Sequence, residues 1–307
     1  MSSVKTLMKK RGFGEFLYNW RVAPYVFVLP FMLSFLIFWI YPFLSAIQMS
    51  FQDILPGQIT WVGLRNYENL FKDSTFFTAI GNSFLYMVLT ILFLIPFPLF
   101  FAVLLDSNFV KAKGLFKALL YVPALTSIVV SGIIFRMAFS EMPNSVANQI
   151  IAFFGREPVR WLSMKGTAFF ALVLVCCWRW TGVNMLYFLS GLKAIDPGLY
   201  ESAEIDGATR AQKFRYITVP MLKPTAIYVL TISVYAGLAM FMEVYMLMGN
   251  GGPRNIALTI VGYLYRRGIE RNQLGYASAI GIVLLVIALT INTIQLTLTG
   301  TLRQRKS

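Results

Sequence analysis

The sequence of 307 residues contains no histidine, only two cysteines, and few charged residues, 13% of the total. The absence of histidine excludes imidazole acid–base catalysis and His-ligated metal sites. Cys176 and Cys177 are adjacent, which disfavours a disulfide between them, and a zinc site needs more ligands. We therefore expect both to be packing residues in a chain without a metal site. A G-x-x-x-x-G-K-[ST] phosphate loop is also absent, so the chain is not expected to hydrolyse ATP or to be an enzyme.

Hydrophobic residues make up 57% of the chain, and long apolar runs recur along it. A helix needs about 20 largely apolar residues to cross a bilayer, and several runs reach that length. The first run is too long for a cleaved signal peptide, and no small-residue cleavage site follows it. The sequence therefore predicts an all-α membrane protein with six transmembrane helices. These helices are expected over Pro24–Met49, Ile80–Leu105, Leu115–Phe139, Thr167–Leu192, Lys223–Met248 and Leu274–Thr299.

The distribution of Lys and Arg between the loops predicts the orientation, because cytoplasmic loops carry the excess. With both termini in the cytoplasm, sixteen of these residues lie inside and nine outside. This gives a cytoplasmic arm over 1–23, a six-span transmembrane domain over 24–299 and a cytoplasmic tail over 300–307. The bias explains much of the net charge of +14, so a nucleic-acid partner is not needed.

One predicted outer loop departs from this charge rule. Arg254, Arg266, Arg267 and Arg271 fall between the fifth and sixth spans, with only Glu270 to offset them. Two explanations remain open at this point. Either the loop folds as a small outer structure, or the last span begins earlier than its hydropathy indicates.

A polar segment over residues 193–222 interrupts the apolar pattern on the predicted cytoplasmic side. Asp196 is suited to cap a short helix that begins with a proline. Gly207 follows where a left-handed residue would end that helix. Thr209, with a glutamine three residues later, forms a capping box for a second helix, and Pro220 ends it before the fifth span. We predict a compact helix–turn–helix loop.

The charges of this loop suit docking onto a soluble partner. Glu201 and Glu204 are three residues apart and share one face of the first helix. Ser202 and Ala203 are small enough to allow close approach, and Arg210 adds a positive charge on the second helix. The plain alternative is an ordinary solvated helical hairpin, and the charges alone do not decide between the two.

The order of residues in the loop resembles the cytoplasmic signature loop of ABC importer permeases. Glu201-Ser202-Ala203 is followed after three residues by Gly207, and after nine more by Ile217-Thr218-Val219-Pro220. The family pattern is Glu-Ala-Ala, three residues, Gly, nine residues, Ile, any residue, Leu-Pro, so both spacings match. Serine replaces an alanine and valine replaces the leucine, and both changes are conservative in size.

The resemblance extends over most of the chain, to sugar permeases of the maltose type. It is carried by the stretches FWIYPFLSAIQMSF, WVGLRNYENLF, NSVANQIIAFFGREPVRWL and MLMGNGGPRNIALTIVGYLYRRG. The last of these stretches is similar to the first of the two permease subunits that such importers carry. The resemblance implies location in the inner membrane of a prokaryotic cell.

The resemblance further implies a permease subunit of an ATP-driven importer for a carbohydrate, by default an oligosaccharide. ATP and Mg would be bound by separate ATPase subunits. A second permease subunit, in a heterodimer, and an extracytoplasmic sugar-binding protein are the other implied partners, beside membrane lipid. The loop would couple to the ATPase subunit, with Glu201 contacting its basic residues. The implied coupling residues are Glu201, Ser202, Ala203, Glu204, Asp206, Gly207, Arg210, Ile217 and Pro220.

Polar residues within the spans are the candidates for a substrate path, because charges are costly there and aromatic faces suit sugar rings. Glu243 in the fifth span is the main candidate. Alternatives stay open: Trp and Tyr often serve as interfacial anchors, Arg179 can extend to the membrane surface, and Glu243 or Arg136 can pair with the second permease. The candidate path residues are Glu243, Arg179, Trp178, Trp180, Asn184, Tyr235, Tyr245 and Asn292.

An ion-coupled secondary transporter of sugars or other small polar solutes is the alternative function. It would need intramembrane carboxylates for ion coupling, and often an internal repeat of the spans. Glu243 is the only acidic residue within the predicted spans, and the two three-span halves show no visible similarity. The signature loop favours the ABC importer.

Overall fold

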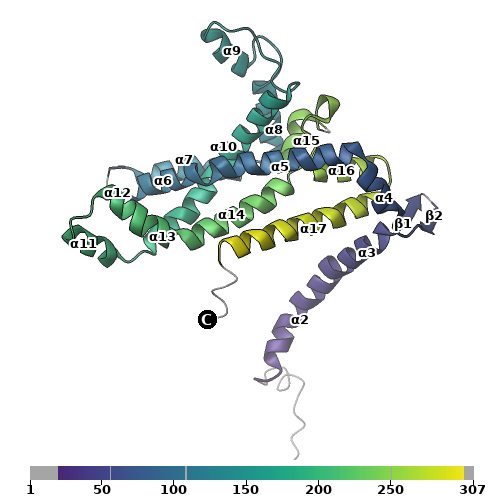
Figure 1. Ribbon diagram of the computed structural model, residues 1–307, viewed down its shortest axis with the longest axis horizontal. Coiled ribbons are helices and arrows are strands. Elements are labelled where there is room, and N and C mark those ends of the chain that lie inside the picture. The colour runs from purple at the N-terminus through teal and green to yellow at the C-terminus, as the bar shows by residue number, and fades with distance from the viewer. Residues whose placement is uncertain (1–19, 56, 108, 250, 301–307) are drawn as a thin grey trace, which may run out of the picture.

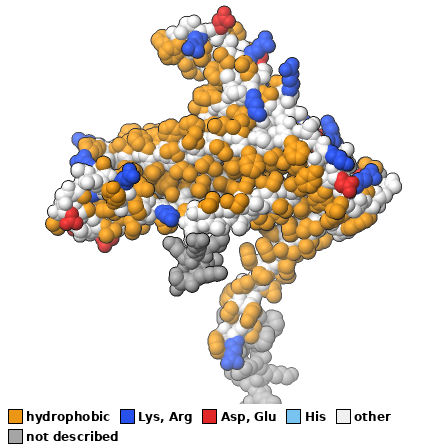
Figure 2. Space-filling view, viewed as in Figure 1, with side chains coloured by type: hydrophobic (Ala, Val, Ile, Leu, Met, Phe, Trp, Pro, Cys, Tyr) orange, Lys and Arg blue, Asp and Glu red, His pale blue; other side chains and the backbone are white. Residues whose placement is uncertain are grey.

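The computed structural model describes residues 20–55, 57–107, 109–249 and 251–300. Long helices lie side by side and run between two opposite ends of the molecule (Figure 1). The polar segment 193–222 forms one of these two ends, which we call the loop end. A β-hairpin and short helices form the other, which we call the hairpin end. Apolar side chains cover the body between them, and charged side chains gather toward the extremities (Figure 2).

Four helical segments are individually long and apolar enough to cross a membrane, and two bent pairs raise the number to as many as six. The bounds of the four long segments lie within a few residues of the corresponding predicted spans. The first comprises α2 (Ala23–Phe35), a π-helical turn η1 (Leu36–Ile40) and α3 (Tyr41–Ser50). The others are α5 (Ser74–Leu94) with α6 (Pro96–Asp106), α10 (Lys165–Lys193) and α17 (Leu274–Leu298).

The third predicted span, Leu115–Phe139, is bent rather than straight. Its two parts, α7 (Lys113–Leu125) and α8 (Ile128–Ala138), meet at 95°. Pro123 lies in the last turn of α7 and lacks the backbone N–H that would bond the carbonyl of Leu119, which weakens this turn. Thr126 then adopts extended backbone. The arm that α8 begins projects from the bundle and carries α9 (Val146–Phe153) at its tip (Figure 1).

The fifth predicted span, Lys223–Met248, is also interrupted. It consists of α14 (Lys223–Leu238) and α15 (Met242–Met248), with residues 239–241 outside either helix. The hydroxyl of Thr259 donates a hydrogen bond of 2.7 Å to the carbonyl of Met240. A backbone group released by the break is thereby satisfied, as interrupted membrane helices require.

The central helix α10 contributes much of the buried core and packs against α5, α6 and α7. A Cβ atom added to Gly182 would lie 1.9 Å from the carbonyl oxygen of Leu120, so α10 and α7 touch backbone to backbone there. Cys176 is buried in this core, Cys177 is half-buried, and both thiols are free. These positions agree with the packing role that we expected.

The first span stands apart from this core. No residue of α2 is buried, and α2 diverges from the other helices while α3 packs against α17 (Figure 1). Its exposed side chains include Phe27, Phe31 and Phe38. This apolar surface is suited to lipid or to another apolar protein surface.

The hairpin end contains the folded form of the arginine-rich loop. Its antiparallel hairpin pairs Gln52 with Trp61. Of the two explanations considered for the loop, a small folded structure is the correct one, because three short helical elements precede α17. The elements of this end are β1 (Gln52–Leu55), β2 (Gln58–Trp61), α4 (Arg65–Lys72), η3 (Pro253–Asn255), α16 (Ile260–Tyr265) and the π-helical turn η4 (Arg266–Glu270).

Candidate functional site

The first helix of the polar loop, α11 (Pro197–Ile205), has the two caps predicted from the sequence. The carboxylate of Asp196 accepts a hydrogen bond of 3.0 Å from the backbone N–H of Gly198. At the other end Gly207 has φ +76°, a left-handed conformation that glycine adopts without steric cost. The N–H of Ala208 donates to the carbonyl of Ala203 at 2.8 Å, which closes the turn.

The second helix of the loop begins with the predicted capping box. The N–H of Gln212 donates to the hydroxyl of Thr209, and the N–H of Thr209 donates to the side-chain carbonyl of Gln212 at 2.7 Å. Pro220 lies in the last turn, and the helical segment Arg210–Met221 ends one residue later, with α14 following at 61°. This segment comprises α12 (Arg210–Lys213), the π-helical turn η2 (Phe214–Thr218) and α13 (Val219–Met221).

Side-chain contacts hold the two helices of the loop together. The hydroxyls of Tyr200 and Thr218 are 2.8 Å apart and hydrogen-bonded. Lys213 forms an ion pair with Glu204, and the hydrogen bond from Lys213 lowers the pKa of that carboxyl below its ordinary value. Two predicted docking residues therefore have partners within this chain, because Arg210 also lies over the ring of Phe109 at 5.6 Å.

The outward surface of α11 is exposed in the part of the chain that the structure describes. None of its residues is buried, and the side chains of Glu201, Ser202 and Asp206 are exposed. Ile205 is 88% exposed beside them. Ile217 differs from these residues because it is half-buried and packs against the apolar core. The loop thus offers a stiff, mixed acidic and apolar surface on short capped helices.

A cavity of about 240 Å³ lies between α5, α10 and the interrupted fifth span. Three of the predicted path residues, Glu243, Trp180 and Asn184, line it. Ala239 and Met240, at the break in the fifth span, line the same space. The other polar lining residues, Tyr86, Thr90 and Ser233, could not be predicted, because isolated Tyr, Ser and Thr in apolar runs carry no distinguishing pattern.

Arg179 does not line this cavity, but it approaches Glu243, which does. The Nη1 atom of Arg179 lies 4.0 Å from Oε1 of Glu243, and its guanidinium lies 5.6 Å from the centre of the Trp180 ring. Nη2 donates a long hydrogen bond of 3.5 Å to the carbonyl of Thr126. Nε and Nη1 of Arg179 are buried without a hydrogen-bond acceptor. A buried cation with spare donors is costly, so this site is suited to an additional acceptor.

Asn184 has a structural partner as well as a place in the cavity wall. Its Nδ2 donates a hydrogen bond of 3.1 Å to the carbonyl of Leu94. That carbonyl would ordinarily accept from the residue four positions later, which is Pro98 and has no N–H. The side chain of one helix therefore satisfies a backbone group that a proline leaves open in another.

The remaining four path candidates do not line the cavity. Trp178 packs on Phe135 at 5.2 Å, and Tyr235 is 64% exposed on α14. Tyr245 contacts the rings of Phe241 and Tyr265. The remaining one, Asn292, donates from Nδ2 to the carbonyl of Ala288 in its own helix at 2.9 Å.

Comparison with known proteins identifies relatives over nearly the whole length of the chain. Residues 99–307 match the family described as binding-protein-dependent transport system inner membrane component. The arabinooligosaccharides transport system permease protein AraP of Bacillus subtilis is 48% identical over 300 residues, covering 98% of this chain and 96% of that protein. The lactose transport system permease protein LacF of Rhizobium radiobacter is 30% identical, covering 89% of this chain and 93% of LacF.

Solved structures show the same fold. A chain of a bacterial ABC transporter involved in the import of the acidic polysaccharide alginate superposes with a TM-score of 0.81 at 28% identity, covering 91% of this chain and 95% of that chain. A second structure of an alginate ABC transporter, in complex with an alginate pentasaccharide-bound periplasmic protein, gives a TM-score of 0.81 at 27% identity, covering 95% of this chain and 98% of that one.

Proposed function

Because this chain belongs to the family of inner membrane components of binding-protein-dependent transport systems, we propose that it is one permease subunit of an ATP-driven ABC importer of oligosaccharides. The observation that carries the proposal is the 48% identity with AraP over 98% of this chain. Arabinooligosaccharides are therefore the first substrates to test. The ion-coupled alternative has no comparable support.

The polar loop would connect this chain to a separate ATPase subunit, which binds ATP and Mg. Its exposed surface, with Glu201, Ser202 and Ile205, is available to a cleft of such a subunit. The capped helices and the Tyr200–Thr218 hydrogen bond make the loop stiff enough to transmit a displacement. Because the loop meets α14 at a sharp bend, movement of the docked loop would rotate the fifth span.

The cavity beside the broken fifth span is our candidate for part of the translocation path. Sugar hydroxyls would donate hydrogen bonds to Glu243, which lines the cavity, while Arg179 lies behind Glu243 and balances its charge. The ring of Trp180 would present an apolar face to a sugar ring. Interrupted helices supply such sites in other transporters because their free backbone groups line a cavity.

Two further partners follow from the proposed function. A second permease subunit would cover apolar surface that this chain leaves exposed, including that of α2, and would complete the path. An extracytoplasmic binding protein would deliver the oligosaccharide to the hairpin end. This assignment rests on the orientation predicted from the loop charges, with the loop end in the cytoplasm.

Reconstitution tests the function directly. Both permease subunits and the ATPase subunit would be placed in vesicles with ATP inside, and uptake of labelled arabinotriose would be measured with and without the binding protein. We expect uptake that requires both ATP and the binding protein. Uptake driven by an ion gradient without ATP, or uptake of peptides or ions only, would contradict the proposal.

A further inference from the structure

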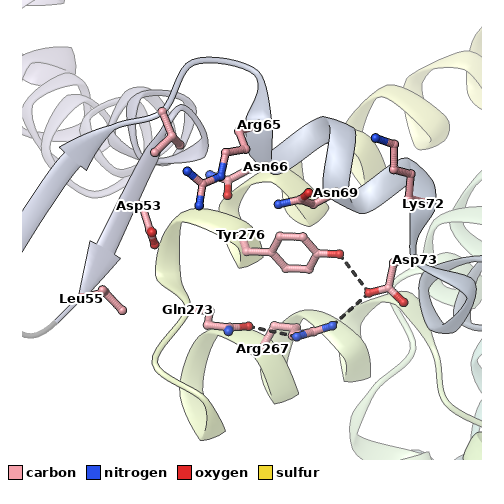
Figure 3. Close-up of a pocket in the computed structure, with 11 residues that line it drawn as sticks. Asp53, Leu55, Arg65, Asn66, Asn69, Lys72, Asp73, Arg267, Gln273 and Tyr276 are labelled. Atoms are coloured by element: carbon pink, nitrogen blue, oxygen red, sulfur yellow. Dashed lines mark hydrogen bonds and ion pairs between the residues drawn. The ribbon is translucent and has the colours of Figure 1, made fainter.

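A second, larger cavity lies at the hairpin end, away from the cavity between α5, α10 and the interrupted fifth span. It has a volume of about 470 Å³ and opens between the hairpin, α4 and the start of α17 (Figure 3). Its lining is predominantly polar and includes five charged side chains. These are Asp53, Arg65, Lys72, Asp73 and Arg267.

Two of the five charges neutralise each other at one side of the cavity. Nη2 of Arg267 lies 3.0 Å from Oδ2 of Asp73, and the hydroxyl of Tyr276 donates to the same oxygen at 3.0 Å (Figure 3). Tyr263 also donates a hydrogen bond to this carboxylate. Arg267 further donates to the side chain of Gln273 at 3.1 Å. Asp73 is therefore fully engaged by groups of this chain.

The cations of α4 are not engaged in this way. Arg65 and Lys72 are seven residues apart, about two helical turns, so they lie on the same face of α4. Within the described part of the chain, neither side chain forms a hydrogen bond or an ion pair. Asp53 is the remaining acidic group of the lining, and Glu68 of α4 does not line the cavity. The unpaired charges of the lining thus have a positive excess.

The cavity is held open by hydrogen bonds between its walls. Nδ2 of Asn66 donates to the carbonyls of Ser50 and Gln52, each at 2.9 Å, which fixes α4 against the hairpin. Asn66 itself is buried, and its neighbours Arg65 and Asn69 on α4 are exposed and line the cavity (Figure 3).

We propose that this cavity receives an acidic side chain, an aspartate or glutamate on the surface of the extracytoplasmic binding protein. The guanidinium of Arg65 can hold a carboxylate through two parallel hydrogen bonds, and Lys72 adds a second charge. The amide of Asn69 supplies a further donor. The inference rests on the proposed function and its orientation, and it gives the basic outer surface a role in steering an acidic partner.

The proposal is tested by titrating the purified complex with arabinotriose-loaded binding protein of the same transport system and measuring ATP hydrolysis. In the variant R65E/K72E we expect the concentration that gives half-maximal stimulation to rise at least about tenfold at low salt. The charge-preserving variant R65K/K72R should fall between wild type and R65E/K72E, because it keeps both positive charges but loses the paired hydrogen bonds of Arg65. Hydrolysis without binding protein should be equal in all three, because the loop end is unchanged.

Three other results would each overturn the inference. If R65E/K72E needs the same concentration of binding protein for half-maximal stimulation as wild type, the cavity does not bind an acidic group of that protein. Binding of free arabinotriose that R65E/K72E abolishes, with unchanged response to the binding protein, would make the cavity a sugar site instead. A wild-type complex that no binding protein stimulates would contradict the proposed function itself, whereas the first two results leave that function standing.

Discussion

At the scale of single residues, the polar side chains inside this membrane protein often serve the backbone. Asn184 donates to the carbonyl of Leu94, which Pro98 leaves without its helical partner. Thr259 does the same for the carbonyl of Met240 at the break in the fifth span. Such contacts allow the helices to be interrupted without leaving unsatisfied groups in the apolar core.

Replacing Asn184 by Leu should destabilise the protein, because the Leu94 carbonyl would stay buried and unpaired. A lost partner of this kind costs about 1–3 kcal/mol, which lowers the thermal midpoint by several degrees. The matched control is Asn292→Leu, since Oδ1 of Asn292 is already buried without a partner. Thermal unfolding of the purified complex would compare them. Equal midpoints for the two variants would refute the role given to Asn184.

Gly207 is the residue on which the turn of the polar loop depends. With φ +76°, a β-branched residue there is strained by at least about 1–2 kcal/mol. We expect Gly207→Val to reduce arabinotriose uptake about tenfold at equal amounts of membrane-inserted protein, because the loop loses its fixed shape. Gly207→Asn is the control, since asparagine tolerates left-handed backbone. Full uptake by Gly207→Val would count against a stiff coupling loop.

At the scale of elements, the carboxylate of Asp73 joins segments that are far apart in the sequence. It lies between α4 and α5 and accepts hydrogen bonds from Tyr263, Arg267 and Tyr276. Burial raises the pKa of Asp73, but these hydrogen bonds and one from the N–H of Thr75 outweigh it, so the pKa lies below the ordinary value of 3.8. The ionised carboxylate therefore stabilises the folded hairpin end.

The stabilisation by Asp73 should depend on pH in one direction. Because the folded-state pKa is lowered, the stabilisation is fully present above pH 3.8 and is lost as the pH falls through the folded-state value. The thermal midpoint of wild type should exceed that of Asp73→Asn by a constant amount between about pH 5 and 7. The difference should shrink toward pH 3. A difference that grows on acidification would contradict this assignment.

Sequence patterns predicted local elements better than the bends between them. Asp196, Gly207 and Thr209 were recognised as caps because each signal lies within four residues of the group it serves. The bend at Thr126 and the break after Leu238 were missed, because hydropathy reports how apolar a segment is and not where its helix stops. At each interruption a backbone carbonyl accepts a hydrogen bond from a distant segment: that of Thr126 from Arg179 and that of Met240 from Thr259.

Clusters of residues that are far apart in the chain could not be predicted from the sequence, because they form only when distant segments pack together. Asp73 and Tyr276 are separated by 203 positions, and no local spacing connects them. Of the path candidates, Trp180 and Asn184 of α10 and Glu243 of α15 meet at the cavity. The pairing of Arg179 with Glu243 needed the fold, because residues 64 positions apart become neighbours only when α15 packs on α10.

At the scale of the whole molecule, the cavity beside the broken fifth span lies between the loop end and the hairpin end. The buried charge pair of Arg179 and Glu243 adjoins this cavity. Breaking a buried pair by removing one partner costs about 3–5 kcal/mol, whereas replacing both with apolar residues is often neutral. We expect Arg179→Leu to lower the thermal midpoint of the complex more than Arg179→Leu combined with Glu243→Leu. Losses that simply add would show that the two side chains do not interact.

The central claim is that the polar loop contacts an ATPase subunit on the cytoplasmic side. Ser202→Cys would be introduced in a chain with Cys176 and Cys177 changed to Ala, and crosslinking to the co-expressed ATPase subunit measured with and without ATP. Ser74→Cys, an exposed position at the hairpin end, is the control. We predict an ATP-sensitive crosslink from position 202 and none from position 74. A well-inserted protein that crosslinks from position 74, or from neither position, would contradict the account.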